Sequence, residues 1–284
     1  MRLGCSRLIG CHRCGSWTYL PRHSEGEQVA IHDSPEYFDH PYFESRRKTN
    51  PHLEKRCRGV FTQLGSAIDL ITLRGQRLLD IGCDTGAFLD CAARHLGIVP
   101  VGVDVAARAV AGAASLGIEG YQTSIERAPT HLRDFPVITA IDLIEHVNDP
   151  SILLQEIRSR LRPGGVAYLE TPNIRSAVYC IGRVLCRMTR GWPPSLFNRL
   201  FPPQHIQYFT ADGLAALASS SGFEVVQIKS RVLSWSDIAA SWPVRASMAA
   251  LQACDRLTGN RILLCATLRR PINDKRLPRS TRQS

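Results

Sequence analysis

The feature that most constrains the fold is an apolar strand that breaks into a glycine-rich turn and leads into a helix, a second strand and a terminal acid. The first half covers residues 77–89, and the second half is the segment Val-Gly-Val-Asp at 101–104. Glycines in the turn let the backbone approach a ligand closely, and the final acid can accept hydrogen bonds from both hydroxyls of a ribose. This layout predicts a parallel sheet that binds a nucleoside-containing cofactor.

The chemistry of the turn distinguishes between two kinds of cofactor. A dinucleotide site carries Gly-x-Gly-x-x-Gly around a pyrophosphate, whereas this turn reads Asp80-x-Gly82-x-Asp84-x-Gly86. Acids repel a pyrophosphate but suit S-adenosylmethionine, which carries a sulfonium and an ammonium group. On these residues the chain resembles the class I S-adenosylmethionine-dependent methyltransferases, and the resemblance covers roughly residues 40–230. It implies a cofactor site formed by Asp80, Gly82, Cys83, Asp84, Gly86, Asp104, Val105, Ile125, Glu126 and Asp142.

One residue of the turn departs from the family pattern. The family usually has glycine at position 84, so Asp84 adds a β-carbon and a negative charge near the place where the methionine carboxylate would lie. Aspartate is among the residues that best tolerate left-handed backbone angles. We therefore expect weakened rather than abolished cofactor binding.

Alternating strands and helices continue on both sides of this motif, as is typical of a parallel sheet. The last two expected strands form a pair, and the family resemblance implies that one of them is antiparallel. The prediction is an α/β protein with a Rossmann-like, doubly wound, mostly parallel seven-stranded sheet that contains one antiparallel strand. The expected strands are 77–81, 99–104, 120–122, 136–141, 166–170, 223–228 and 261–268, and the expected helices are 52–71, 87–96, 106–116, 151–161 and 211–220.

Length and charge indicate how the chain is divided. A chain of 284 residues with 44% hydrophobic residues can bury one sizeable core with extensions. We expect a Cys- and His-containing extension at 1–40, a methyltransferase domain at 41–270 and a basic, disordered tail at 271–284. Residues 269–284 hold six basic residues and one acid, which is half of the net charge of +10. The basic balance therefore does not predict a nucleic-acid partner.

The sequence also bears on the cellular compartment. It contains no run of eighteen apolar residues, so no transmembrane helix is expected, and the N-terminus lacks an apolar core of signal-peptide length. The ten cysteines are scattered through expected helices and strands, which is typical of reduced thiols in a core. These observations predict a cytoplasmic protein.

Residues 174–210 interrupt the alternation and are expected to form a helical lid. The insertion has two interpretations. It either packs as a lid over the substrate, or its part at 174–201 also contacts an anionic membrane surface through a basic face. The apolar residues of the expected helix are Val178, Ile181, Val184, Leu185 and Met188, and arginines recur on the opposite side at 183, 187 and 190.

Acids and histidines gather after the fourth expected strand. Asp142, Glu145 and His146 follow that strand directly, and His205 comes 59 residues after the first of these histidines. Because ligands lie beyond the carboxyl ends of parallel strands, we expect these side chains near the reacting methyl group. The pattern resembles two groups of methyltransferases: the ubiquinone-pathway O-methyltransferases, and the small-RNA 3′-terminal ribose methyltransferases. In the second group an acid, a Glu-His pair and a later His hold a metal.

Three interpretations of this set stay open. Asp142, Glu145, His146 and His205 could hold Mg²⁺ or another divalent ion, which would chelate two substrate oxygens and lower the pKa of one hydroxyl. Without a metal, either histidine could act as the general base, so Glu145, His146 and His205 are the catalytic candidates. Alternatively, Glu145 and His146 only orient the cofactor or the following helix.

A possible zinc site lies near the N-terminus. Cys11 and Cys14 form one knuckle of the kind that ligates zinc. A second knuckle is missing, and Cys5 with either His12 or His23 would complete four ligands only at irregular spacing. We therefore expect a remnant of a zinc site rather than a bound ion.

Together these features predict an enzyme. The first expectation is a methyltransferase that acts on an oxygen of a small hydroxylated metabolite, such as a sugar, a quinol precursor or a secondary metabolite. An RNA ribose 2′-O-methyltransferase is the alternative enzyme, although no RNA-binding module is visible in the sequence. A non-catalytic cofactor-binding interaction protein is the alternative from another class, suggested by Asp84 and the cysteine-rich start. The acceptor and the oligomeric state stay open.

Overall fold

The computed structural model describes most of the chain. The described residues are 2–3, 6–34, 51–192, 197–198, 200–202, 204–233, 249–251, 253, 255 and 258–273. The tail expected at 271–284 lies outside them from residue 274 onward, as do several residues of the insertion at 174–210. Within the described ranges, no helix combines the length and the apolar character needed to cross a membrane.

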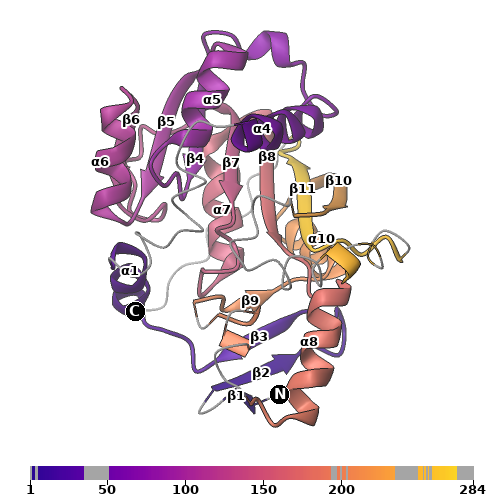
Figure 1. Ribbon diagram of the computed structural model, residues 1–284. Helices are drawn as coiled ribbons and strands as arrows, with labels where there is room; N and C mark the ends of the chain where they lie inside the picture. Colours follow the sequence, from indigo (N-terminus) through magenta and orange to yellow (C-terminus); the bar gives the residue numbers. More distant parts are fainter. Residues whose placement is uncertain are drawn as a thin grey trace.

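A seven-stranded sheet forms the centre of the larger part of the protein (Figure 1). Its order is β10-β11-β8-β7-β4-β5-β6; the five strands from β8 to β6 are parallel, and β11 runs antiparallel to both of its neighbours. The predicted mostly parallel sheet with one antiparallel strand is confirmed. The strands are β4 (Arg77–Ile81), β5 (Val99–Asp104), β6 (Glu119–Gln122), β7 (Phe135–Ile141), β8 (Leu161–Pro172), β10 (Glu224–Arg231) and β11 (Leu263–Arg269).

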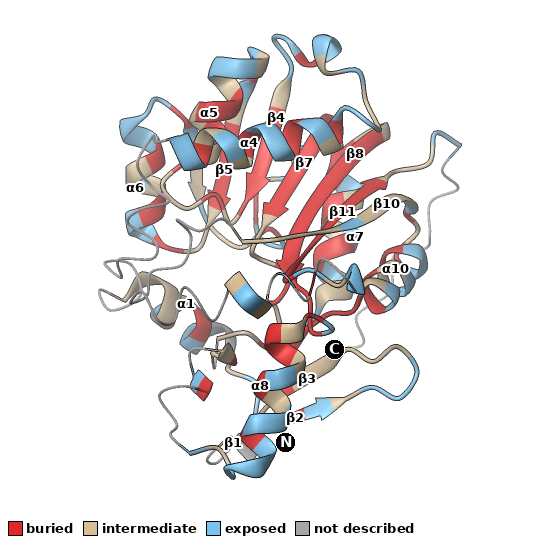
Figure 2. Ribbon diagram, turned by 45° about the vertical axis from the view of Figure 1, so that its right-hand side comes forward, coloured by how far each residue is buried: buried red, intermediate tan, exposed pale blue. Residues whose placement is uncertain are grey.

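Helices cover both faces of this sheet. Successive residues of a strand point to opposite faces, so Leu78 packs in a cluster with side chains of α4 and α5, and Leu79 packs in a cluster with side chains of α7 and α10. Figure 2 shows the strands as a buried layer beneath helices whose outer faces are exposed. The helices are α4 (Pro51–Leu64), α5 (Ala87–Leu96), α6 (Ala107–Ser115), α7 (Pro150–Arg160) and α10 (Ala211–Ser220).

The helix expected at 52–71 is two elements in the structure. Helix α4 ends at Leu64, where Gly65 and Ser66 are poor helix formers. A short 3-10 helix, η1 (Leu70–Leu73), begins where the Asp69 side chain accepts a hydrogen bond from the Ile71 amide at 3.0 Å. Local capping therefore divides a segment whose apolar spacing alone predicts one helix.

A smaller sheet joins the start of the chain to the insertion. Its order is β1-β2-β3-β9, and β3 pairs with β9 through Trp17 with Tyr208 and Thr18 with Gln207. In Figure 1 this sheet lies below the large sheet, with α8 beside it. The sequence did not predict these strands. The elements are β1 (Arg2–Leu3), β2 (Ser6–Gly10), β3 (Trp17–Leu20) and β9 (Gln207–Tyr208), with helices α1 (Glu25–Asp33) and α8 (Ala177–Met188).

Candidate active site

The glycine-rich turn between β4 and α5 has left-handed backbone at three alternate positions. The φ angles are 72° at Gly82, 47° at Asp84 and 80° at Gly86. A β-carbon at Gly86 would lie 2.6 Å from Cδ1 of Ile118 and 3.2 Å from Cα of Ala113, so only glycine fits there. Aspartate adopts left-handed angles at low cost. The turn therefore keeps a tight course although the family's usual glycine is replaced at position 84.

Two acids with raised pKa values flank this turn. Asp104 accepts hydrogen bonds from the amides of Asp84 at 3.0 Å and Ala106 at 2.9 Å, and buried Asp80 accepts one from the Thr139 hydroxyl at 2.6 Å. Burial raises the pKa of Asp80 to about 8 and the pKa of Asp104 to about 6. The charged form of each acid is thus disfavoured until a cation compensates it. This electrostatic environment suits a positively charged ligand.

Arg56 on α4 connects Asp142 with a fully buried glutamate. Its guanidinium donates to Oδ2 of Asp142 and to Oε1 of Glu170, each at 2.7 Å. Glu170 lies on β8 and also accepts a hydrogen bond from Nε of Arg231 at 2.9 Å. Asp142 follows β7 with a φ of 55°, and its carboxylate is held by an arginine that the sequence pattern did not indicate.

Backbone hydrogen bonds bring His205 to the Glu145-His146 turn. The Ile206 amide donates to the carbonyl of Glu145 at 2.8 Å, and Nδ1 of His146 lies 3.0 Å from the carbonyl of Gln204. The two imidazole rings meet edge to face, with their centroids 4.6 Å apart and an interplanar angle of 88°. The structure therefore brings together the three catalytic candidates Glu145, His146 and His205.

A third imidazole comes from the N-terminal extension. The ring of His32, on α1, meets His146 edge to face with centroids 4.9 Å apart. The chain leading into α1 is fixed beside this turn, because Asn148 donates to the carbonyl of His23 at 3.0 Å and Arg22 donates to the carbonyl of Asn148 at 2.8 Å. Sequence reasoning missed His32. We call His32, His146 and His205 the histidine cluster.

The only sequence signal near His32 is a capping box at the start of α1. Ser24 and Glu27 exchange side-chain and backbone hydrogen bonds at 2.7 Å and 3.3 Å, so Ser-x-x-Glu predicts a helix there. Nothing in the sequence predicts where that helix packs.

The rings of the histidine cluster are neutral at neutral pH. Burial lowers the pKa of His32 and lowers that of His205 to about 4; burial and repulsion from the other two rings lower the pKa of His146 further below its ordinary value. Nδ1 of His32 lies 2.7 Å from the Gln28 carbonyl. Because a carbonyl only accepts, Nδ1 of His32 and of His146 carries the proton, and each Nε2 keeps a lone pair. These nitrogens can accept a proton or bind a metal.

The donor set fits a divalent ion. The ligand atoms of Glu145, His146 and His205 lie within 4.8 Å of one another, whereas Asp142 does not belong to this group. Nδ1 of His205 is buried and has no hydrogen-bond partner among the described residues. Burial, with the charge of Asp142, raises the pKa of Glu145 well above its ordinary value, so a cation would compensate its charged form. The Nδ1–H of His146 also donates a hydrogen bond to the Gln204 carbonyl, as the second ring nitrogen of metal-binding histidines does.

The remaining cofactor candidates differ in where their side chains lie. Cys83 and Ile125 are buried in the two apolar clusters of the sheet, so a ligand can reach only their main chain. Val105 is half-buried, and Glu126 is exposed. These four residues follow the carboxyl ends of β4, β5 and β6, as the sequence pattern predicts.

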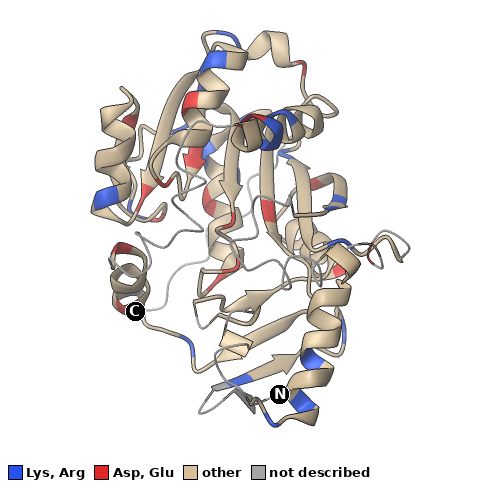
Figure 3. Cartoon of the chain, in the orientation of Figure 1, with Lys and Arg blue, Asp and Glu red and all other residues tan. Residues whose placement is uncertain are grey.

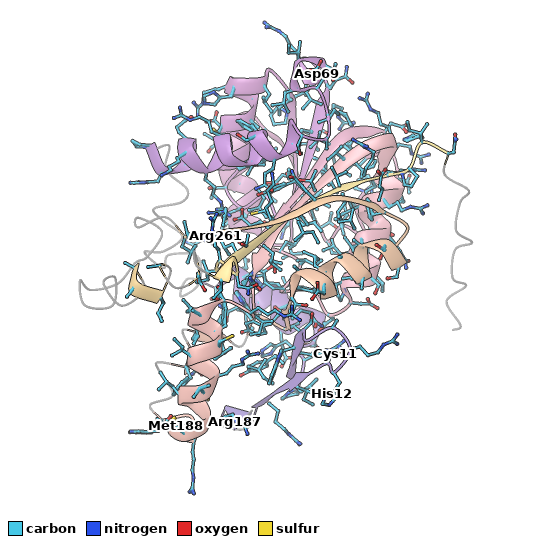
Figure 4. The ribbon with its side chains drawn as sticks, turned by 90° about the vertical axis from the view of Figure 1, so that its right-hand side faces the viewer. Cys11, His12, Asp69, Arg187, Met188 and Arg261 are labelled. Atoms are coloured by element: carbon cyan, nitrogen blue, oxygen red, sulfur yellow. The ribbon has the colours of Figure 1, made fainter. Side chains whose placement is uncertain are left out.

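Cys11 and Cys14 lie at the turn between β2 and β3. The Gly15 amide donates to the Cys11 carbonyl at 2.9 Å and closes this turn. Figure 4 shows Cys11 and His12 among the short strands, away from the large sheet. In the part of the chain that the structure describes, no third residue joins the two cysteines in a metal-binding group.

Comparisons with known proteins identify a domain in this chain. A family model described as "Methyltransferase domain" matches residues 51–228. The ubiquinone biosynthesis O-methyltransferase of Nitrobacter winogradskyi is 31% identical over 165 residues, which cover 55% of this chain and 62% of that protein. The enzyme of the same name from Coxiella burnetii is 31% identical over 166 residues, or 56% of this chain and 68% of that protein. The chain thus spans less than two thirds of the Nitrobacter relative.

Solved structures share the fold at low sequence identity. Phosphoethanolamine N-methyltransferase 2 of Haemonchus contortus, in complex with S-adenosyl-L-methionine, has a TM-score of 0.61 at 15% identity, covering 90% of this chain and 63% of that one. The cyclopropane synthase MmaA2 of Mycobacterium tuberculosis has a TM-score of 0.59 at 19% identity, covering 87% and 98%. These likenesses establish the Rossmann-like fold.

Proposed function

Because this chain belongs to the class I S-adenosylmethionine-dependent methyltransferases, we propose that it methylates an oxygen of a small hydroxylated metabolite. The observation that carries this proposal is the histidine cluster with Glu145, which is built around the turn that follows β7. The names of the two curated relatives support an oxygen as the acceptor atom and a quinol precursor as one class of acceptor.

The cofactor supplies an electrophilic methyl group on a sulfonium. Asp80 and Asp104 flank the turn where its cationic and ribose portions would bind. The acceptor hydroxyl must lose a proton as its oxygen attacks, and a neutral imidazole, which carries a lone pair on one ring nitrogen, can accept that proton. In the alternative mechanism, Glu145, His146 and His205 would hold a divalent ion, whose charge would lower the pKa of the hydroxyl; the two imidazoles would then be ligands and not the base.

A methyl-transfer assay tests the proposal. Purified protein is incubated with methyl-labelled S-adenosylmethionine and a panel of catechols, quinol precursors, sugars and short RNA duplexes, with and without EDTA. Label in a small hydroxylated acceptor supports the proposal, and label only in RNA would favour the ribose methyltransferase instead. Activity that survives EDTA, with no ion in the purified protein, would remove the metal from the mechanism but keep the imidazole as base.

Cofactor affinity is expected to rise with pH. The pKa of Asp80 in the free protein is about 8, so the acid is mostly protonated at pH 7, and a bound cation favours its charged form. Binding then releases a proton, and the association constant increases by up to about tenfold per pH unit between pH 6 and 8. Calorimetry in buffers of different ionisation enthalpy measures both quantities. In the control Asp80→Asn, the proton release should disappear; a wild-type affinity that is flat over this pH range contradicts the assignment.

We also propose that α8 contacts an anionic membrane surface. Val178 of the expected apolar face is buried, but Val184 and Met188 are 56% and 75% exposed, and Trp192 just beyond the helix is 72% exposed. Figure 3 shows Arg on this helix and no acid. An exposed apolar face with basic flanks is typical of helices that lie in a membrane interface. The buried thiols of the core fit the reducing cytoplasm, so we assign the contact to the cytoplasmic leaflet.

Replacing Val184 and Met188 together by serine is expected to reduce partition onto vesicles with anionic lipid roughly tenfold, because two apolar side chains no longer enter the interface. Sedimentation with vesicles measures this effect. Ile152→Ser, on the exposed side of α7, is the matched control and should leave partition unchanged. Equal partition of all three proteins would leave α8 with the role of a lid alone.

A further inference from the structure

A second group of side chains that could hold a metal ion lies outside the proposed active site, between α4 and α5. Glu54 comes from α4, and Cys91 and His95 come from successive turns of α5. Their ligand atoms lie within 4.8 Å of one another. Two of the three residue types, cysteine and histidine, are the ones that zinc prefers.

The distances between the ligand atoms of this group are close to those in a zinc site. One atom, Oε2 of Glu54, lies 2.5 Å from Nε2 of His95 and 3.7 Å from Sγ of Cys91. At ordinary zinc–ligand lengths, tetrahedral coordination separates a sulfur from an oxygen ligand by about 3.6 Å and a nitrogen from an oxygen by about 3.4 Å. An ion therefore needs only a small outward movement of His95, whose side chain is 40% exposed.

A second thiol lies against the first. Cys57 is one helical turn after Glu54 on α4, is fully buried, and shares a hydrogen bond with Cys91. Cys57 does not belong to the three-residue group, so its thiol would have to turn toward the ion to become the fourth ligand. Two cysteines, one histidine and one glutamate would complete four ligands.

The surroundings of the group support a bound cation. Arg94 donates to Oε1 of Glu54 at 2.9 Å, which leaves Oε2 as the oxygen that faces Cys91 and His95. With two thiolates and one carboxylate around Zn²⁺, the site would carry one net negative charge, and this guanidinium would balance it. An arginine that orients a ligating carboxylate is a usual supporting interaction around protein metal sites.

We propose that Glu54, Cys57, Cys91 and His95 form a structural zinc site that joins α4 to α5. This site is independent of the proposed methyl transfer and separate from both Glu145 and Cys11. Its position has a structural consequence. Helix α5 begins at the glycine-rich turn, and α4 carries Arg56, so the ion would fix two elements that border the candidate active site.

Metal analysis of the full-length protein tests the proposal. Wild type, purified under reducing conditions and dialysed against micromolar free zinc, should retain zinc. The zinc content of Cys91→Ser and of His95→Ala should each be lower by one equivalent per chain. Cys186→Ser and His131→Ala are matched controls in the same residue types and should not change the count. The double variant Cys11→Ser, Cys14→Ser removes the N-terminal cysteines as possible zinc ligands and should also leave this equivalent in place.

Two further measurements distinguish zinc from the alternatives. Free zinc at a hundredfold excess over its dissociation constant should raise the Tm of wild type by roughly 5–10 °C. The rise should be smaller in His95→Ala, and because His95 is exposed, this substitution should not itself unfold the protein. Co²⁺ in place of zinc should give a thiolate charge-transfer band that Cys91→Ser weakens. Zinc retained in full by Cys91→Ser, no zinc in wild type, or a Cys57–Cys91 disulfide in the reduced preparation would each overturn the proposal.

Discussion

Replacement of His205 by alanine is expected to lower kcat for methyl transfer by about 10²- to 10⁴-fold, the usual contribution of a positioned general base. The imidazole meets His146 at 4.6 Å and stays neutral at physiological pH, because burial lowers its pKa to about 4. Its ring contacts among the described residues are with His146 and Tyr208, so the dissociation constant of S-adenosylmethionine should change little. Steady-state kinetics and calorimetry on the same preparation separate the two quantities.

The control for this experiment is His131→Ala. His131 is exposed and lies 3.2 Å from the hydroxyl of Tyr121, outside the histidine cluster. It should retain kcat within about twofold, since exposed substitutions away from the site rarely matter. If His205→Ala keeps a rate within threefold of wild type, His205 is not the base and the proposed role fails. His32→Ala, measured beside it, reports whether the N-terminal extension takes part in the reaction.

Replacement of Glu170 by alanine is expected to cost about 3–5 kcal/mol in the free energy of unfolding. The carboxylate is fully buried and pairs with Arg56 and Arg231, so its removal leaves two guanidinium groups, only 16% and 26% exposed, without their shared partner. For a chain of this size, Tm should fall by roughly 6–20 °C. Urea unfolding followed by circular dichroism measures the change.

An exposed ion pair provides the control for Glu170. Asp212→Ala removes a partner of Arg175 at 2.9 Å, but both side chains are more than half exposed, so the cost should stay below about 1 kcal/mol. If Glu170→Ala costs no more than Asp212→Ala, the buried network does not stabilise the fold.

The same network should make the protein sensitive to acid. Burial alone would raise the pKa of Glu170, but Arg56 and Arg231 hold it below the ordinary value of 4.5. A depressed folded-state pKa means that this stabilisation is present above the unfolded pKa and is lost as pH falls through the folded pKa. Glu170→Ala should therefore unfold with less pH dependence than wild type below pH 4.5.

Sequence patterns predicted the large sheet because its central strands are buried on both faces and its strands alternate with amphipathic helices. The helix at 87–96 has the bounds of α5, and the strands at 77–81 and 99–104 have the bounds of β4 and β5. Glycines mark both ends of α5, since Gly86 and Gly97 take left-handed conformations that few other residues adopt. The strands β1, β2 and β3 follow one another without helices between them, and β9 has only two residues, so none of them belongs to an alternating pattern of strands and helices.

The candidate site was only partly predictable for a related reason. The acids and the Glu-His pair stand directly after strands, and strand ends meet at one edge of a parallel sheet. His32 and Arg56 belong to helices outside the alternating core, so their positions depend on tertiary packing that no local pattern encodes. Arg56 also explains why Asp142, predicted as a metal ligand, instead lies against a guanidinium in the structure.

The pairing of β3 with β9 has a consequence for synthesis of the chain. Thr18 leaves the ribosome long before Gln207, its hydrogen-bond partner 189 residues later. The first strands therefore cannot complete their sheet until most of the polypeptide exists, and closing such a distant contact is slow. During that interval the nascent hairpin exposes an unpaired edge that can associate with other chains. Yield in cells should thus depend on holdase chaperones more than the stability of the finished protein suggests.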